Sequence, residues 1–588
     1  MAGDDDVCSL KEIPIENELW LTYLNTPGTY LPQTVGAPAC ELFSVGVCRN
    51  SKYFQQHDVF QIYGTITLYD VDGTSYELYC RAFGDSQTLT PEHNLLSLDM
   101  SVDCLISTTW SHMVLNLMDK ADDAVVVKQC LNFDKLTDIN QCNKVELADN
   151  SVFVTYAAFR AAVVAILKIT LIKTNDSSPV NLSGKIIAHC GNTYGHKYPG
   201  IVLLNSPSFE AISNVPILLS RDVVVVPAHS FLRIDLHLSQ LDPHQQEDIT
   251  CQADFLAKHL SNHNDDIVTK DFVVRFKVHW RHPYALKDNS RQLFEHHKIS
   301  NVPQRHPFRR ESAYSLLDVY GVMIHHDTDS ELKICGTMKI CDNFTKFILF
   351  DRNEMNPVKI SRNDGTIPIV VQRRCFNMSP DYLYMALMLK DVEGQVLIEG
   401  EIFWNESHVK KPMSWYDKRI CSVIRGVRGY AEVFYTIFSK AEQAQVTITL
   451  CGEYGYVGMG FIYCVDGSVV ARHSNETYLT EHDKTYYQSV LFRGNSSNVQ
   501  SGFTLPLSKS VVAVPIGASL TIAVDLYVKP LSLGHSQEHL ESEVSFNLGS
   551  KILQIIKHER CSILVSVEWS DLDKLIYEEI KDAYEEGF

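Results

Sequence analysis

Pairs of histidines are the residues in this chain whose type could bind a metal ion. His325-His326-Asp327 is one such cluster, and His296-His297 is another. A zinc site needs three or four convergent ligands. Neighbouring residues on a strand point to opposite faces of the sheet. We therefore predict that these side chains are solvated and that the chain has no metal site.

His189 and Cys190 have the types of a nucleophile and its base. Such a pair works only when the two side chains meet. Alignment with a similar segment later in the chain, described below, places Tyr463 and Cys464 at these positions. The histidine is lost in that alignment, so we predict a buried cysteine rather than a catalytic pair.

The sequence Asp70-Val-Asp72-Gly73-Thr follows an apolar, strand-like segment. It resembles the phosphoryl-transfer motif of haloacid-dehalogenase-type enzymes, in which the first aspartate is the nucleophile and the second is the general acid. That fold requires a helix after the motif and a parallel sheet around it. Here the segment YELYC follows at once, which is typical of the return strand of a hairpin. We therefore predict a type I′ turn.

Two further clusters have simpler interpretations. One is basic and includes Lys298, Arg305, Arg309 and Arg310; we interpret it as a solvated linker, with contact to RNA or an acidic partner as the alternative. The other is CGEYGYVGMG, with glycines at 452, 455, 458 and 460. Its spacing differs from that of a phosphate-binding loop, and no lysine follows it. We predict no catalytic, cofactor-binding or metal-binding residue, no cofactor, and no enzyme activity.

Composition and charge limit the classes of partner. The chain has 588 residues, 45% of them hydrophobic and 21% charged, with a net charge of −19. An acidic chain is poorly suited to binding phosphates, so nucleic acid and anionic membranes are disfavoured. Neither an apolar signal segment nor a run of about 20 apolar residues is present. We therefore expect a cytoplasmic or nuclear protein whose 16 cysteines are mostly reduced and buried.

Self-similarity dominates the sequence. Five blocks recur in the same order, at an offset that grows slowly along the chain, as loop insertions between diverged duplicates produce. The matched blocks are 60–70 with 332–342, 76–81 with 347–352, 156–171 with 435–450, 219–227 with 507–515, and the last strands ending at Trp280 and Trp569. We infer a tandem duplication.

Each matched block alternates apolar and polar residues with a period of two, which indicates half-buried strands. In 60–68 the predicted inward residues are Phe60, Ile62, Gly64, Ile66 and Leu68. We therefore predict a mainly β chain of two tandem antiparallel sandwich or barrel-like domains with a short C-terminal helix. The predicted segments are a leader (1–40), the first domain (41–282), a basic linker (283–313), the second domain (314–572) and an acidic helix (573–588).

These blocks resemble a plant domain of unknown function that is abundant in cereals. The resemblance is carried by IYGTITLYD, the segment YELYCRAFGDSQTLTPEHNLLSLD, VTYAAFRAAVVAILKITL and PILLSRDVVVVPAHSFLRIDL. The first copy retains Arg81, Asp85 and Gln87 of a family-like R-x-x-x-D-x-Q segment, and the second copy has RNEMNPV instead. In that family the domain also occurs C-terminal to the N-glycosidase domain of jasmonate-induced ribosome-inactivating proteins. The toxin's Glu-Ala-Ala-Arg-type helix is missing here, so the resemblance implies the companion module alone.

The resemblance and the missing catalytic constellation together favour a non-catalytic interaction or regulatory protein in plant stress or defence. Its expected partner is another protein, with a ribosome-inactivating protein as one candidate that it would restrain or target. The alternatives are a lectin-like sugar binder and a degenerate rRNA N-glycosidase. A duplicated module can also bind two sites at once and gain avidity.

Overall fold

We analysed a computed structural model of the chain. It describes residues 34–48, 54, 59–69, 75–99, 106–107, 112–133, 142–148, 151–174, 178–190, 198–241, 248–258, 262–283, 314–326, 331–341, 346–361, 365–369, 375–378, 383–404, 416–451, 462–474, 485–531, 537–549, 552–558 and 561–570. Among these residues, no helix is long and apolar enough to cross a membrane.

The first copy is built of antiparallel strands in two sandwiches that share one long strand. A five-stranded sheet, β3-β2-β6-β7 with β4 beside β2, covers one half, and a four-stranded sheet, β11-β10-β13-β14, covers the other. The bounds of its elements are β1 Thr34–Val47, β2 Phe60–Tyr69, β3 Ser75–Arg81, η1 Phe83–Asp85, β4 Gln87–Leu89, β5 Ile106–Ser107, β6 His112–Asp119, β7 Val125–Asn132, β8 Cys142–Leu147, β9 Val152–Lys173, β10 Val180–Cys190, β11 Ile201–Ala211, β12 Val223–Pro227, β13 Phe231–Gln240, β14 Asp248–Leu256, β15 Asn262–Val268 and β16 Phe272–Arg281.

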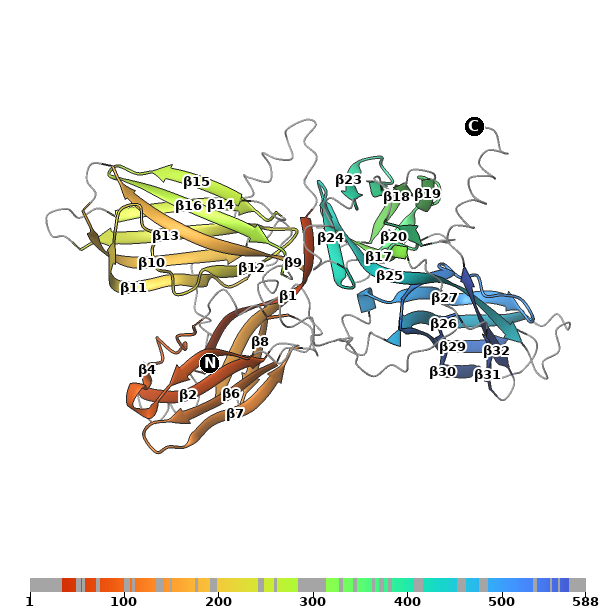
Figure 1. Ribbon diagram of the computed structural model, residues 1–588, viewed down its shortest axis with the longest axis horizontal. Helices are drawn as coiled ribbons and strands as arrows, with labels where there is room; N and C mark the ends of the chain where they lie inside the picture. The colour runs from red at the N-terminus through yellow and green to blue at the C-terminus, as the bar shows by residue number, and fades with distance from the viewer. Residues whose placement is uncertain are drawn as a thin grey trace, which may run out of the picture.

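The second copy repeats this arrangement. Its two small sheets are β19-β18-β22-β23, with β20 beside β18, and β27-β26-β29-β30. The four lobes are separate in Figure 1. The bounds are β17 Tyr314–His326, β18 Leu332–Cys341, β19 Lys346–Arg352, β20 Val358–Ile360, β21 Phe376–Asn377, β22 Tyr384–Asp391, β23 Val396–Phe403, β24 Arg419–Arg425, β25 Gly429–Cys451, β26 Ile462–His473, β27 Ser489–Gln500, β28 Val511–Pro515, β29 Ser519–Pro530, β30 Glu538–Asn547, β31 Ile552–Lys557 and β32 Ser562–Ser570.

The long strands β9 and β25 each contribute to two hydrophobic cores. Val152, Val154 and Tyr156 of β9 pack into the first core, whereas Leu167 and Ile169 pack into the second. The inward residues change from even to odd numbers, which requires an irregularity in the pairing. The β1–β9 pairing shifts register between Ala37/Ala39, and β17–β25 shifts between Tyr314/Leu316 at the corresponding place. A β-bulge therefore divides each copy into two sandwiches.

Strand pairing also joins the two copies. Thr34, Val35 and Gly36 of β1 pair antiparallel with Val423, Ser422 and Cys421 of β24. The remaining core strands of both copies thereby form a single 14-stranded sheet. Figure 1 shows β1 and β24 side by side at the centre of the molecule, between the lobes. The copies are thus connected by backbone hydrogen bonds in addition to the linker.

A glycine in the second strand of every small sheet marks a finer repeat. Gly64, Gly184, Gly336 and Gly467 all have a positive φ, between 116° and 142°. A Cβ at each would lie 2.1–2.2 Å from a carbonyl oxygen of the neighbouring strand. The flanking residues follow the same pattern of alternating apolar positions, and the four sheets share one strand order. We infer that each copy is itself a diverged pair of sandwiches.

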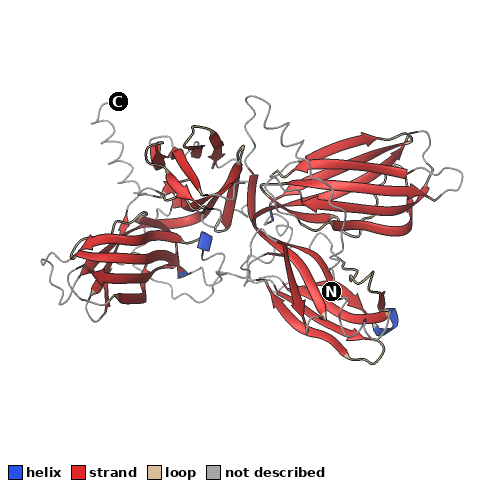
Figure 2. Ribbon diagram, turned by 180° about the vertical axis from the view of Figure 1, so that it is seen from behind, coloured by secondary structure: helices blue, strands red, loops and turns tan. Residues whose placement is uncertain are grey.

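The structure confirms the mainly β fold and the tandem duplication, and Figure 2 shows strands in all four lobes. It adds a finer division, because each copy contains two sandwiches. The strand β1 begins at Thr34, within the range assigned to a leader. Phe60, Ile62, Ile66 and Leu68 are buried as predicted. The predicted linker beyond residue 283 and the predicted C-terminal helix lie outside the described residues.

Candidate functional site: buried charge clusters at the sheet junctions

The prediction that His325 and His326 are solvated is wrong. His326 is 9% exposed, and the side chain of His325 lies against Glu432, with Nε2 2.7 Å from Oε2. Both histidines end β17 beside β25, where the two copies meet. Two adjacent histidines in the sequence do not reveal that β25, more than 100 residues later, lies beside them. Asp327, His296 and His297 lie outside the described residues.

His189 and Cys190 end β10, and the alignment used for their counterparts is wrong. The strands β10 and β26 are equivalent when Gly184 is aligned with Gly467. In this alignment Arg472 is the counterpart of His189, and His473 is the counterpart of Cys190. Cys190 is buried as predicted, and its thiol donates to the Val225 carbonyl at 3.4 Å. His189 lies instead beside Asp235, with Nε2 3.2 Å from Oδ2. The pair is not assembled for nucleophilic attack.

The hairpin predicted around the aspartate motif is present. Tyr69 pairs with Ser75, so β3 returns antiparallel to β2, as the sequence YELYC indicated. Asp70, Asp72 and Gly73 themselves lie outside the described residues. The glycines between 452 and 460 and the four basic linker residues do so as well.

Arg81, Asp85 and Gln87 have roles within the fold of the first copy. Arg81 Nη1 lies 2.7 Å from Asp85 Oδ2, and both side chains are largely exposed. Gln87 donates to the Leu95 carbonyl at 3.1 Å and accepts from the Ser97 backbone N–H at 3.0 Å. These contacts order the segment after η1. In the second copy Val358 occupies the register position of Gln87.

A buried ion pair, which the sequence reasoning did not find, joins the two halves of the first copy. Glu41 of β1 pairs with Arg221, which lies two residues before β12. The Val225 backbone N–H also donates to Glu41 Oε2 at 2.7 Å, and Arg221 donates to the Leu42 carbonyl at 2.8 Å. Burial raises the pKa of Glu41, while Arg221 and the Val225 N–H oppose that shift. Removal of either partner would leave a buried charge without compensation.

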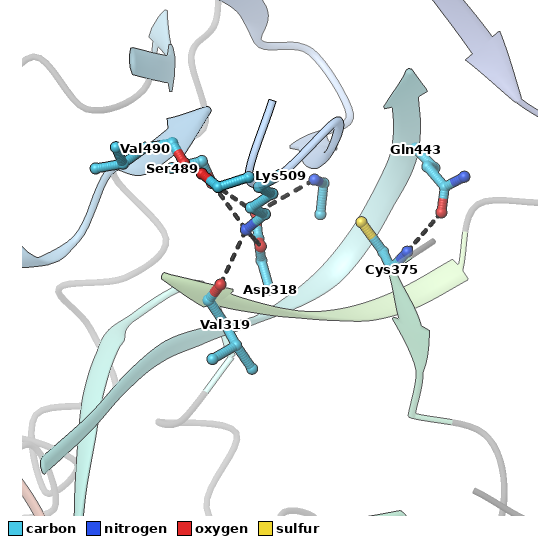
Figure 3. Close-up of polar contacts among 9 residues, drawn as sticks. Asp318, Val319, Cys375, Gln443, Ser489, Val490 and Lys509 are labelled. Atoms are coloured by element: carbon cyan, nitrogen blue, oxygen red, sulfur yellow. Dashed lines mark hydrogen bonds and ion pairs between the residues drawn. The ribbon is translucent and has the colours of Figure 1, made fainter. Parts of the chain in front are cut away.

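The second copy has the same arrangement with shorter side chains. Lys509, two residues before β28, pairs with Asp318 of β17 (Figure 3). Its ammonium also donates to the Val319 carbonyl at 2.9 Å and to Ser489 Oγ at 3.0 Å. The Ala513 backbone N–H donates to Asp318 at 3.3 Å. The basic residue within LSRDVVVVP and LSKSVVAVP, in an otherwise apolar block, was the sequence signal for both pairs.

A third buried cluster spans the two copies. Arg160, at the bulge of β9, reaches Glu432 of β25, with Nε 3.0 Å from Oε2. Arg160 also donates to the Tyr486 hydroxyl at 2.9 Å and lies over its ring. Burial alone would raise the pKa of Glu432, but Arg160 and His325 lower it to about 2. Burial lowers the pKa of His325; Glu432 opposes that shift, and Arg160 adds to it.

Stacked rings and a second arginine complete the junction. The ring of Tyr430 stacks between His229 of the first copy, at 4.2 Å, and His325 of the second, at 4.4 Å. Arg425 is fully buried and donates to the carbonyl oxygens of Ala228 and Ala257 in the first copy. These contacts bury charge and aromatic surface from both copies at one place, which stabilises their relative position.

The buried charges form ion pairs and hydrogen bonds within the chain. The described residues contain no group of three or more histidine, cysteine or acidic side chains that could bind a metal ion. None of the cysteines that the structure describes forms a disulfide. Burial raises the pKa of the thiols of Cys40, Cys190 and Cys421, which makes them poor nucleophiles.

The two copies match a known family. Residues 39–278 and 316–567 each match the model of a "Domain of unknown function (DUF6598)". The chain belongs to the DUF6598 family. It contains the domain twice, in agreement with the duplication seen in the sequence and with the two β halves of the structure.

Other comparisons give less information. A search of curated proteins found no match to this DUF6598 chain. Among solved structures, the chain is similar to "Extended-Synaptotagmin 2, C2A- and C2B-domains", with 9% identity and a TM-score of 0.12. That match covers 47% of this chain and 91% of the other.

Proposed function

We propose that this DUF6598 chain is a non-catalytic interaction or regulatory protein that presents two linked copies of one β domain to a protein partner. The observation that carries the proposal is the junction of Arg160 with Glu432, combined with the β1–β24 pairing. A junction made of buried charge and backbone hydrogen bonds holds two binding units at a fixed separation. Linked units of this kind gain avidity when both bind the same partner or assembly.

The biological setting that we propose is a plant stress or defence response, in the cytoplasm or nucleus. The domain context of the similar plant family supports this setting, because that domain accompanies ribosome-inactivating N-glycosidases. The proposed partner is such a toxin, which the chain restrains or targets. The net charge of −19 suits a basic protein partner, because opposite charges speed encounter and fix orientation.

The experiment is a binding titration of the full chain against a ribosome-inactivating N-glycosidase, combined with a ribosome depurination assay. We expect saturable binding that weakens as salt is raised, together with altered depurination. The Arg160→Met variant should bind more weakly because the two copies are less firmly positioned, whereas Arg275→Met, which alters an exposed pair, should bind like the wild type. Absence of binding, together with unchanged depurination at saturating chain, would exclude this partner.

The same assays test the enzyme alternative. The chain alone, incubated with ribosomes, should release no adenine. Release of adenine above the buffer blank would overturn the non-catalytic assignment, irrespective of whether the toxin binds. A glycan array tests the lectin-like alternative in the same way, since sugar binding would assign the sandwich faces a different ligand.

A further inference from the structure

The outer face of the second copy carries an uncharged patch at one end of the 14-stranded sheet. Leu553 and Ile555 of β31 are 54% and 50% exposed. Ile555 pairs with Leu564 of β32, and Leu553 pairs with Ser566. On β25, Thr449 and Thr447 complete these two rows. We call the six residues the β31 patch.

The first copy provides a matched comparison at the same register positions. There the row Ile555–Leu564–Thr449 is replaced by Asp266–Arg275–Thr170, and the row Leu553–Ser566–Thr447 by Asn264–Lys277–Lys168. Arg275 and Asp266 form a two-bonded ion pair, at 2.8 and 2.7 Å. The solvent-facing charges of one copy are therefore apolar or hydroxyl side chains in the other. The difference is confined to the outer face, because the inward positions of β16 and β32 are buried and apolar in both copies.

The patch borders an open sheet edge. Within the described residues β31 pairs only with β32, and β15 pairs only with β16. Edge strands pair readily with another strand, and charged side chains on the edge oppose this. The edge strand β15 carries Asp265 and Asp266, whereas β31 carries no acidic residue. The edge strand of the first copy thus carries two acids, whereas the only charge on the edge strand of the second copy is Lys557 at its end.

We propose that the β31 patch and the open edge of β31 bind a second copy of this chain. The strands pair antiparallel about a two-fold axis, and the sheet continues from one chain into the other. With the axis at Gln554, Leu553 lies opposite Ile555 of the partner subunit, and the reverse pair forms by symmetry. Such a contact is self-complementary, as a two-fold interface requires. Apolar cross-strand pairs stabilise it.

Charge favours a second copy at this site over other faces of the molecule. A net charge of −19 makes most of the surface of two identical chains repel. The six residues of the β31 patch contain neither acid nor base, and the one charged residue of β31 is Lys557 at its end. The proposed register therefore brings no acidic side chains of the two copies together. The chain already uses this mode of joining, because β1 of the first copy pairs antiparallel with β24 of the second. The second-copy contact extends the same sheet by the same type of hydrogen bond.

The test is the mass of the full chain in solution by light scattering over a range of concentrations. We expect a shift from 66.6 kDa to twice that mass as the concentration rises. The double variant Leu553→Glu/Ile555→Glu should remain monomeric, because like charges would face each other across the axis. A control double variant at the matched positions of the first copy, Asn264→Glu/Arg275→Glu, should dimerise as the wild type does. Both variants should retain the wild-type circular dichroism spectrum, since the altered side chains are exposed or half-buried.

A transplant provides the converse test. The variant Asn264→Leu/Asp265→Gln/Asp266→Ile/Arg275→Leu recreates the patch on β15 and β16 and removes both acids of the β15 edge. It should associate beyond the dimer, because each chain then has two open edges without acids. Three results would overturn the proposal. One is a wild-type chain that stays monomeric with β31 amides that exchange rapidly with deuterium, which shows that no second copy covers the edge. Another is a monomer with protected β31 amides, which indicates coverage by the chain's own residues. The third is a dimer that survives Leu553→Glu/Ile555→Glu.

Discussion

Arg160 in the first copy lies 3.0 Å from Glu432 in the second, nitrogen to oxygen, with both side chains buried. Arg160 occupies a bulge position of β9, where the strand moves from one sandwich core to the other. The register places Ser439 at the same position of β25. The two copies therefore differ at the place where they meet. That asymmetry gives the pair a specific orientation.

Loss of this ion pair should destabilise the chain. Arg160→Met leaves Glu432 buried with only His325 as partner, and we expect a loss of about 3–5 kcal/mol in the free energy of unfolding. Urea unfolding followed by tryptophan fluorescence measures it. The double variant Arg160→Met/Glu432→Leu should regain much of that loss, because no unpaired charge remains. Arg81→Met, at an exposed pair, is the control and should change the stability by less than about 1 kcal/mol.

The junction should also make stability depend on pH. The pKa of Glu432 is about 2 when folded and 4.5 ordinarily, so its contribution is present above pH 4.5 and is lost as the pH falls toward 2. The folded pKa of His325 lies below its ordinary 6.5, so the unfolded chain takes up the proton first. Its contribution is present above pH 6.5 and is lost below it. Because both pKa values are lowered by folding, we expect the free energy of unfolding to decrease in acid.

Thermal unfolding between pH 2 and 8 measures this dependence. His325→Gln should flatten the stability profile just below pH 6.5, and Glu432→Gln should flatten it below pH 4.5. An unaltered slope in both variants would show that other groups control the acid response. His539, whose side chain is 41% exposed, is a suitable control position for substitution.

The equivalent ion pairs should be interchangeable when they are exchanged as a set. Lys509→Met alone leaves Asp318 unpaired, and we expect it to cost about 3–5 kcal/mol. Asp318→Glu/Lys509→Arg imports the pair of the first copy and should retain more stability than Lys509→Met. Chemical denaturation of the three chains compares them. An equal loss of stability in both variants would contradict the prediction that the two ion pairs are interchangeable.

The shared glycines should resist substitution. Gly336 has φ +123°, and a Cβ there would lie 2.1 Å from the Met388 carbonyl oxygen. Gly336→Ala should therefore cost about 1–3 kcal/mol in backbone strain, with a further cost from the clash. Gly84→Ala is the control, because an added Cβ there has no heavy atom within 4 Å. Comparable melting temperatures for the two variants would contradict the proposed role.

The sequence predicted the strands and the duplication because both depend on local alternation and on matched blocks. The inward positions of 60–68 and the tryptophans that end β16 and β32 followed from that alternation. The second sandwich in each copy was missed, although the glycine pattern that surrounds Gly64 recurs around Gly184. Buried pairs such as Glu41–Arg221 join residues 180 positions apart, and no local period relates them. The prediction for His325 failed for the same reason.

Calorimetric unfolding of the full chain tests most directly whether the two copies form one unit at their junction. The wild type should unfold in one cooperative transition in which both copies melt together. Arg160→Met should separate it into two, as the copies lose their coupling. Two separate transitions already in the wild type, unchanged by Arg160→Met, would contradict the account.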